Sequence, residues 1–595
     1  MKKMYFCNVN RNYIIVLEFV LLILSPQAGH GQTWDDLNRR PYPQWFGDAK
    51  LGIFVHWGLY SVPAYASKEG YGEWFYRGLM TGDSVRRRVM ALYADTSLPA
   101  WEQYRQLPDH WHGELWKPQE WAHLFKEAGA RYVVLVTKHH DGYCLWDSPQ
   151  QPEWNSVTSG PRRDIVGELT DAVRAEDLRM GFYYSLPEWT NPRHIWMQDP
   201  DTAIGDYVDN YMVPQFKELV SRFHPCLIFA DGDWQNSPDE FRSTELIDWY
   251  YRTVGPDAIV NDRWGHGTQH GFRTPEYSAG ISLTDRPWAE CRGLGRSFGL
   301  NRNEDLCNYL TDRELIQHFC DLVAHGGGLT LNVGPSADGT IPLIQQERLR
   351  ALGNWLQVNG EAIYGSRPWN NSTACRPTDR EHCSMPMPPA MQIDYDWVRN
   401  APLKEMPVDN FEIHWQGYFE APGHATYYIK AVADDEITVV HKGDTILHHN
   451  HAWADNNDVY KIGRMDPTEE FDMDIYYRER DLEASVSLLV SDDGMHYALM
   501  PIEKLQSTAT WQRTIRCFTQ KDDNLYVIEF ERPGSTLAIP DMPRLQKKTE
   551  ITILGTTGSV RWKQHKDGTL TLYLSSLDPK ELNALDHAWV IKIAH

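Results

Sequence analysis

The sequence is poor in cysteine and in positive charge. Nine cysteines in 595 residues are too few for a disulfide-stapled scaffold. None of them forms a Cys-x-x-Cys pair, which argues against a structural zinc site, although Cys375 and Cys383 are close enough in sequence to bridge a loop. Lysine and arginine number 58 against 81 acidic residues, so the formal net charge is −23. We therefore do not expect nucleic acid as a partner, because its phosphates attract a basic surface.

Long apolar runs are also missing, apart from residues 14–24 near the start of the chain. This run follows Lys2, Lys3 and Arg11 and is too short to span a membrane comfortably. Small residues follow it, as in an export signal that is cleaved off. We therefore expect residues 1–32 to be a signal peptide, the mature protein to be exported to the periplasm or the cell surface, and no membrane span elsewhere.

Aromatic residues, by contrast, are abundant, with 24 Trp and 30 Tyr. From about residue 45 to 335, short apolar runs alternate with amphipathic stretches, which predicts parallel strands joined by helices. The runs are apolar throughout, as in strands that are covered on both faces. We expect an α/β fold with a (β/α)8-like TIM barrel, and a doubly wound sheet is the alternative. The runs are 51–58, 132–142, 180–185, 226–233, 258–265 and 329–335.

These runs end on polar residues. In a parallel barrel the carboxyl ends of the strands share one side, where the loops build the site. We therefore expect a ring of polar side chains there. Its members are His56, His139, His140, Asp141, Tyr184, Asp231, Asp233, Asn261, Asp262 and Arg263.

Asp231 ends the stretch "CLIFADGDW" and is the first candidate for chemistry. Two acids near a pocket fit glycoside hydrolysis, in which one carboxylate is the nucleophile. A helix cap, or a metal site shared with Asp233, is the alternative. His139 and His140 suggest a metal-dependent hydrolase, but neighbours in an extended strand point to opposite faces. Hydrogen bonds to sugar hydroxyls are the other interpretation of this pair.

The character of the chain changes after residue 370. We expect a linker at 371–404, because this stretch is rich in Pro, Asn, Ser and Met. We expect a β-sandwich module at 405–500 and a C-terminal β-sandwich at 505–595, because short alternating runs are separated there by turn signals. A "KDG" turn at 566–568 lies between two such runs, as in a β-hairpin.

Seven motifs follow one another in an order that resembles the α-L-fucosidases of glycoside hydrolase family 29. The resemblance covers about residues 33–370, the expected catalytic domain, and the terminal β block. The motifs are "WFGDAKLGIFVHWGLYSVPAYA", "EWFY", "YVVLVTKHHDGYCLWDS", "GFYYSLPEW", "FADGDW", "IVNDRWG" and "LTLNVGPSADGTI".

The resemblance implies a retaining exo-hydrolase that removes terminal α-L-fucose from a fucosylated glycan, with no cofactor and no metal. It implies that Asp231 is the nucleophile. The implied substrate-binding residues are His56, Glu73, Trp74, His139, His140, Tyr184 and Arg263.

The general acid/base has two candidates. Glu290 stands in "RPWAECRG", which resembles a Trp-x-Glu stretch of the family, and Glu276 stands in "FRTPEYS", which resembles a Thr-Pro-Glu stretch. We favour Glu290 and keep Glu276 as the alternative. Whichever acts must be protonated before the glycosidic bond breaks.

Residues 405–495 resemble the protective-antigen-type β-sandwich. Some such modules bind sugar with calcium held by an Asp-Asp pair, and Asp434-Asp435 falls at that place. For the whole chain, the alternatives are a non-catalytic fucose-binding protein on the same scaffold and a retaining glycosidase for another sugar, such as α-L-galactose. The sequence does not set the oligomeric state.

Overall fold

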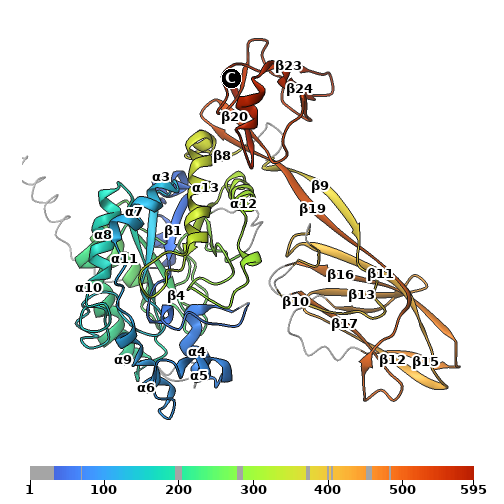
Figure 1. Cartoon of the computed structure of the whole chain (residues 1–595), viewed down its shortest axis with the longest axis horizontal. Helices are drawn as coiled ribbons and strands as arrows, with labels where there is room; N and C mark the ends of the chain where they lie inside the picture. Colours follow the sequence, from blue (N-terminus) through green and yellow to red (C-terminus); the bar gives the residue numbers. More distant parts are fainter. Residues whose placement is uncertain are drawn as a thin grey trace, which may run out of the picture.

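The computed structural model describes residues 33–68, 70–193, 204–277, 286–369, 376–398, 401–403, 406–449, 459–480 and 484–594. They form an α/β barrel, a β-sandwich module beside it and a small β domain that carries the C-terminal end (Figure 1). The expected signal peptide, residues 1–32, and Cys375 lie outside the described residues.

Seven strands form one parallel sheet in the order β5-β4-β3-β2-β1-β7-β6. Neighbouring strands are parallel throughout. Nearly every residue in them is buried, as the uniformly apolar runs predict. The predicted TIM-like catalytic fold is confirmed. The strands are β1 (Leu51–Val55), β2 (Tyr132–Lys138), β3 (Arg179–Ser185), β4 (Leu227–Asp231), β5 (Ile259–Val260), β6 (Ala289–Gly293) and β7 (Gly328–Val333).

The segment 272–276 lies between the two edge strands, β5 and β6. Single parallel bridges join it to Asn261, directly after β5, and to Trp288 and Cys291 on the β6 side. The segment thus takes the place of an eighth strand without a continuous ladder. It also carries Glu276 to the carboxyl edge of the barrel.

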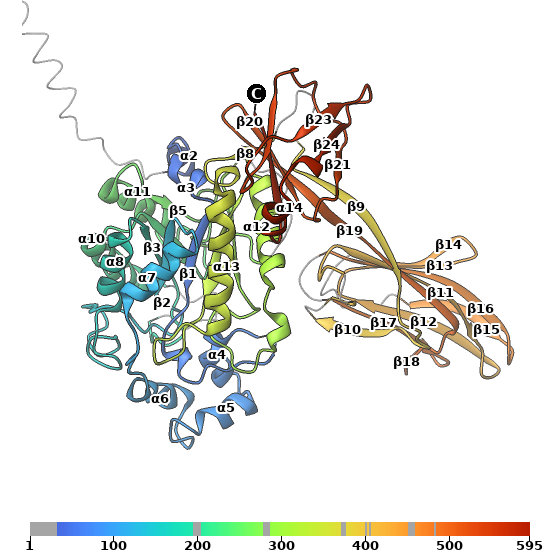
Figure 2. The ribbon, with the colours of Figure 1, turned by 45° about the horizontal axis from the view of Figure 1, so that its top comes forward.

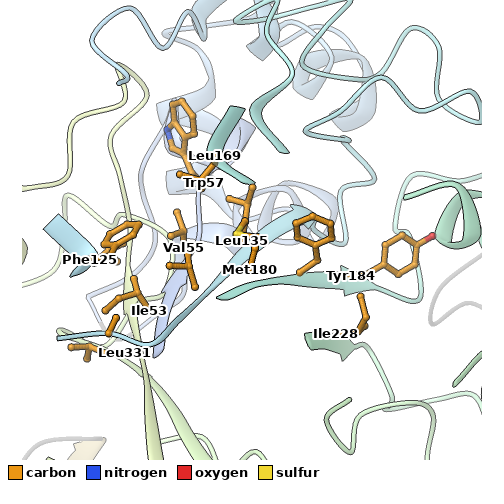
Figure 3. Close-up of a cluster of buried hydrophobic side chains, with 14 of the residues drawn as sticks. Ile53, Val55, Trp57, Phe125, Leu135, Leu169, Met180, Tyr184, Ile228 and Leu331 are labelled. Atoms are coloured by element: carbon orange, nitrogen blue, oxygen red, sulfur yellow. The ribbon is translucent and has the colours of Figure 1, made fainter. Parts of the chain in front are cut away.

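Helices cover the outer face of the sheet. Ile53 and Val55 of β1 point outward and pack with Phe125 and Leu169 of two covering helices (Figure 3). Phe54, between them, belongs to a separate cluster inside the barrel, because side chains alternate along a strand. The longer helices are α7 (Pro118–Glu127), α8 (Ile165–Ala175), α10 (Val213–Phe223), α11 (Ser243–Val254), α12 (Asp312–Ala324) and α13 (Leu343–Asn359).

Local signals fix where these helices begin. α12 starts at a capping box in which the side chains of Thr311 and Glu314 bind each other's backbone N–H groups. α7 begins with Pro118, whose fixed φ suits a first helical turn. The shorter helices are α2 (Trp34–Asn38), α3 (Gln44–Ala49), α4 (Phe75–Met80), α5 (Ser84–Met90), α6 (Ala100–Tyr104), α9 (Gly205–Tyr207) and α14 (Pro579–Asn583).

The β-sandwich module consists of two antiparallel sheets. One holds β14, β13, β16, β11 and the first half of β19, and the other holds β10, β17, β12 and β15, with β18 paired to β17. Buried and exposed residues alternate along β16, as in a strand with one face in the core. The strands are β10 (Asp394–Val398), β11 (Phe411–Glu420), β12 (Ala425–Ala433), β13 (Glu436–His441), β14 (Asp444–His449), β15 (Val459–Met465), β16 (Glu470–Glu479), β17 (Ala484–Ser491), β18 (Ala498–Leu499) and β19 (Glu503–Lys521).

A long two-stranded ribbon joins this module to the C-terminal domain (Figure 2). β19 pairs with β11 in its first half and with β20 in its second, and β9 (Thr378–Pro386) runs antiparallel beside it. The short strand β8 (Arg367–Pro368) also pairs with β19. The remaining strands are β20 (Asn524–Glu529), β21 (Thr536–Ile539), β22 (Glu550–Ile553), β23 (Arg561–Gln564), β24 (Leu570–Tyr573) and β25 (Trp589–Ala594).

The ribbon corrects two predicted boundaries. The expected linker, residues 371–404, contains β9 and β10. The expected break between the module and the C-terminal sandwich, at residues 500–505, is crossed by β19 without interruption. β9 escaped notice because none of its residues is fully buried and only Cys383 and Met385 on it pack against the module's core.

Within the described part of the chain, none of the helices combines the length and the apolar character that a membrane crossing requires.

Candidate active site

A cavity of about 290 Å³ opens at the carboxyl edge of the parallel sheet. Its walls combine aromatic rings with titratable groups. A larger hollow, of about 560 Å³, lies on the outside of the barrel between α7 and α13 and contains none of the predicted site residues. The smaller cavity is lined by Phe54, His56, Tyr71, Glu73, Trp74, His139, Tyr183, Phe229, Asp231, Trp234, Arg263, Glu276, Cys291 and Phe298.

Asp231, the last residue of β4, is 8% exposed and lines this cavity. The hydroxyl of Tyr183 donates to its Oδ2 at 2.8 Å, and Nη1 of Arg263 donates to its Oδ1 at 3.3 Å. Nε2 of His140 lies 3.4 Å from Oδ2. Burial alone would raise the pKa of Asp231, but contacts with His140, Arg263 and Tyr183 hold that pKa far below its usual range. Asp231 is therefore an ionised carboxylate.

His140 is oriented by Ser185, the last residue of β3. The Ser185 hydroxyl donates to the carbonyl of Pro187 at 2.6 Å, so its oxygen accepts from Nδ1 of His140 at 2.5 Å. This contact places a proton on Nδ1 and turns Nε2 toward Asp231, to which Nε2 donates when the ring carries both protons. His140 therefore contacts the carboxylate itself, although it is absent from the cavity wall.

Glu276 reaches the cavity from the segment 272–276. The hydroxyl of Tyr71 donates to its Oε1 at 2.7 Å, and Nη2 of Arg263 donates to its Oε2 at 3.2 Å. The carbonyl of Thr274 fixes the same guanidinium nitrogen at 3.0 Å. A single guanidinium therefore binds Asp231 with one nitrogen and Glu276 with another.

Glu290, the acid/base that the sequence favours, does not reach the cavity. Its neighbours in β6, Ala289 and Cys291, belong to the cluster inside the barrel, so Glu290 points outward. It is 0% exposed and its Oε2 lies 2.6 Å from Nε2 of His318 on α12. The structure thus moves Glu290 from the candidate site to the interface between sheet and helix.

Tyr184 is also placed outside the cavity. Its hydroxyl donates to Oε1 of Gln215 at 2.8 Å, on the outer side of the sheet. The preceding residue, Tyr183, faces inward and contacts Asp231. The motif "GFYYS" contains both tyrosines, and only the direction of the strand's pleat separates them.

His56, Glu73, Trp74 and His139 all line the cavity. Nδ1 of His56 lies 2.6 Å from Oδ1 of Asn332. Burial lowers the pKa of His56 to about 4 and the pKa of His139 well below its usual value, so both rings are neutral near pH 7. Burial raises the pKa of Glu73 to about 8. A neutral imidazole offers one donor and one acceptor, as a sugar hydroxyl requires.

Sequence reasoning missed six aromatic residues that line the cavity. They are Phe54, Tyr71, Tyr183, Phe229, Trp234 and Phe298. Tyr183 and Trp234 stand inside the motifs "GFYYSLPEW" and "FADGDW", next to predicted residues, and Tyr71 lies two positions before Glu73. That proximity is the signal that could have found them. Phe298 comes from a stretch with no such signal.

Among the described residues, no group of three or more His, Cys, Asp and Glu side chains is arranged to hold a metal ion. His139 and His140 face different surroundings, the cavity and Ser185 respectively. In the module, Oδ1 of Asp434 accepts hydrogen bonds from Tyr477 and from the backbone N–H of Ser485.

Two carboxylates at the carboxyl edge of a parallel barrel, in a cavity lined with aromatic rings, define a glycoside hydrolase. Comparison with known proteins then identifies the family. The "Alpha-L-fucosidase" family profile matches residues 23–361, and "Alpha-L-fucosidase C-terminal domain" matches residues 506–594. The chain belongs to the alpha-L-fucosidase family. A "PA14 domain" profile matches residues 387–488, within the β-sandwich module.

Individual relatives agree. The alpha-L-fucosidase of Dictyostelium discoideum is 41% identical over 368 residues, which are 60% of this chain and 79% of that protein. The human tissue alpha-L-fucosidase is 37% identical over 352 residues, 58% of this chain and 74% of that protein. Among solved structures, the Thermotoga maritima alpha-fucosidase bound to a mechanism-based inhibitor superposes with a TM-score of 0.63 at 27% identity, covering 95% of this chain and 99% of that one.

Proposed function

We propose that the protein is an exo-acting α-L-fucosidase that hydrolyses terminal α-L-fucose with retention of configuration. Asp231 is the nucleophile and Glu276 is the general acid/base. The observation that carries this assignment is the pair of carboxylates held by one guanidinium, that of Arg263, in a cavity of about 290 Å³. This volume lies at the lower end of small-molecule sites and suits a single sugar ring.

In the first step, a carboxylate oxygen of Asp231 attacks the anomeric carbon of fucose. The bond from that carbon to the glycosidic oxygen breaks, and the proton of the Glu276 carboxyl group passes to the departing oxygen. The low pKa of Asp231 supports its part in this step, because only the ionised form is a nucleophile.

In the second step, Glu276 is ionised and takes a proton from water. The water oxygen attacks the anomeric carbon from the face that the leaving group vacated, and the bond to Asp231 breaks. Two inversions give overall retention. Retaining enzymes keep their carboxyl groups about 5–5.5 Å apart, closer than inverting enzymes do. That both groups bind the same guanidinium supports such a short separation.

The cavity wall fits a 6-deoxy sugar. The rings of Phe54, Phe229 and Phe298 supply an apolar surface for the methyl group on C5. His56 and His139 supply neutral donors and acceptors for the ring hydroxyls. A hydroxyl on C6, as in α-L-galactose, would lose its water against such a wall without gaining a partner.

We also propose export of the protein, with removal of residues 1–32. The support is the sequence alone, in which a basic start precedes a short apolar run and small residues. N-terminal sequencing of the protein exported by its own host cell checks this proposal, and an intact Met1 there would contradict it.

Azide rescue tests the catalytic assignment. With 2,4-dinitrophenyl α-L-fucoside, whose leaving group needs little protonation, Asp231→Ala is expected to lose at least about 10⁴ in kcat. Azide that takes the place of the missing carboxylate attacks once, so any fucosyl azide formed by this variant has the inverted configuration. Glu276→Ala still forms the fucosyl-enzyme, and azide attacks it without help from a base, which yields a fucosyl azide of retained configuration.

Glu290→Ala serves as the matched control, since it removes a buried carboxylate outside the cavity. It is expected to gain nothing from azide. Rescue of Glu290→Ala but not of Glu276→Ala would return the acid/base role to Glu290. Proton NMR of the first product of the wild type gives the stereochemistry, and initial release of the inverted anomer would refute the two-step mechanism.

A further inference from the structure

Trp234 stands at the mouth of the cavity. It lines the same hollow as Asp231 and Glu276, yet it is 44% exposed. Single exposed aromatic rings are common on protein surfaces and need no function. The Trp234 ring differs because it extends the wall of the cavity that holds Asp231 and Glu276 into the solvent.

The turn after β4 puts the ring there. Gly232 has a φ of +92°, and a Cβ at this position would meet Cδ of Pro187 at 2.3 Å. Only glycine fits both the backbone angle and this close approach. The chain therefore turns sharply after Asp231, and the residue three positions after the nucleophile lies back over the mouth of the cavity.

The indole of Trp234 is held by other rings. Its centroid lies 5.6 Å from that of Trp74 and 5.0 Å from that of His140, at interplanar angles of 50° and 58°. Trp74 in turn packs against Trp189 at 5.2 Å. A tryptophan supported in this way loses little further conformational entropy when a ligand packs against it.

The chemistry defines what must lie at the mouth. The cavity takes one sugar ring, and Glu276 lies where the glycosidic oxygen must be protonated. The ring attached to that oxygen must therefore lie outside, beside the exposed part of the Trp234 indole. A pyranose has an apolar C–H face, and such a face packs favourably against an aromatic ring.

We propose that Trp234 forms the binding subsite for the leaving sugar, a neutral hexopyranose that stacks on its indole. This inference rests on the proposed function and adds a specificity-determining residue to it. Because the contact is apolar stacking, it selects for the presence of a sugar ring more than for one glycosidic linkage.

Two substrates separate this role from catalysis. α-L-Fucosyl fluoride has no leaving ring, whereas fucosyl-galactose and fucosyl-N-acetylglucosamine disaccharides have one. Trp234→Ala is expected to lower kcat/KM for the disaccharides about tenfold, the value of one good aromatic contact, and to leave kcat/KM for the fluoride within about twofold. Trp234→Phe is expected to keep part of the disaccharide rate.

Tyr476→Ala is the matched control. Tyr476 is 46% exposed on β16 of the β-sandwich module and packs against His414, not against the cavity. Tyr476→Ala should change kcat/KM neither for fucosyl fluoride nor for the disaccharides. An equal loss on fluoride and disaccharide in Trp234→Ala would assign Trp234 to the fucose ring itself and overturn the proposal. So would an unchanged disaccharide rate.

Binding keeps the two proposals distinguishable. Calorimetric titration in an Asp231→Ala background compares free fucose with a fucosyl disaccharide. The disaccharide is expected to bind more tightly, and adding Trp234→Ala should abolish the difference. If the wild type hydrolyses neither substrate while this difference stands, the proposed function fails and the subsite remains. If the difference is missing, the subsite fails whatever the rates show.

Discussion

Arg263 joins the two carboxylates of the cavity. Its two terminal nitrogens bind Asp231 and Glu276, and the carbonyl of Thr274 holds one of them in place. Asp231 receives additional donors from Tyr183 and His140, whereas Glu276 receives one from Tyr71. The carboxylate with more donors is the better stabilised anion. Asp231 is thus the carboxylate that its surroundings hold in the ionised form.

Tyr71 is therefore expected to position Glu276 and to tune its proton exchange. Tyr71→Phe keeps the ring, which stacks with Tyr277 at 6.5 Å, but removes the donor to Oε1. A hydrogen bond to a charged group is worth about 1.5–3 kcal/mol, so kcat/KM should fall by about tenfold or more. Because the lost donor favoured the carboxylate, the basic limb of the pH–rate profile should move to higher pH.

Tyr277→Phe provides the comparison for this prediction. Its hydroxyl donates to the carbonyl of Arg296 and does not touch Glu276. It should leave the pH profile in place. The interpretation is wrong if Tyr71→Phe lowers the rate without moving the profile, since a purely structural defect would do that.

At the scale of the secondary-structure element, the sequence predicts the strands but not the direction of their pleats. The apolar runs locate six of the seven strands of the barrel sheet but not β6, whose sequence AECRG is not an apolar run. The polar strand ends correctly indicate the edge that bears the cavity. Tyr183 and Tyr184 are chemically alike, and so are Glu276 and Glu290. Which member of each pair faces inward depends on register with neighbouring strands, and register is a property of the assembled sheet.

The segment 272–276 shows the same limit. It contains no apolar run, and its bridges to both edge strands form only when the barrel closes. No periodicity in the sequence could therefore place Glu276 at the cavity. Motif resemblance kept it as an alternative, and in the closed barrel Glu276 lines the cavity whereas Glu290 does not.

The alternation along β6 yields a stability prediction. Glu290 is buried against His318 of α12, and Nη1 of Arg292 lies 3.8 Å from its second oxygen. Glu290→Gln keeps the shape but removes the charge, and should lower the free energy of unfolding by about 1.5–3 kcal/mol. Hydrolysis of fucosyl fluoride should stay within about twofold of wild type, because the side chain is outside the cavity.

Denaturant unfolding and steady-state kinetics check this prediction together. His318→Gln removes the other partner and should destabilise the protein in the same direction. A drop of about a hundredfold in kcat without any loss of stability would show that Glu290 takes part in the reaction after all.

At the scale of the whole molecule, the order of the motifs identified the catalytic domain. The sequence did not predict how the β-sandwich module is connected to the C-terminal domain. A composition rich in Pro, Ser and Met indicated a linker where the structure has β9. This strand is stabilised by its partner β19, which lies more than a hundred residues later in the sequence. A pairing over such a distance leaves no local pattern. The module is consequently joined to the C-terminal domain by a paired ribbon, not by a flexible tether.

The ribbon makes the module removable. His382 of β9 faces Gln512 of β19 in the antiparallel register, and the whole apolar core of the module lies between residues 383 and 511. Replacing residues 383–511 by Asn-Gly should close the ribbon as a two-residue hairpin. No described residue of the module lines the cavity. The shortened protein should therefore hydrolyse fucosyl fluoride with a kcat/KM within about twofold of the full chain.

Circular dichroism decides how the result is interpreted, because it reports whether the parallel barrel is intact in the shortened protein. A folded but inactive protein would mean that the module completes the active site, and the assignment of all catalytic groups to the barrel would be wrong. Full activity on the fluoride would instead confine the chemistry to the barrel. If the shortened protein is then slower than the full chain only on large glycans, that difference in rate measures how much the module contributes to binding them.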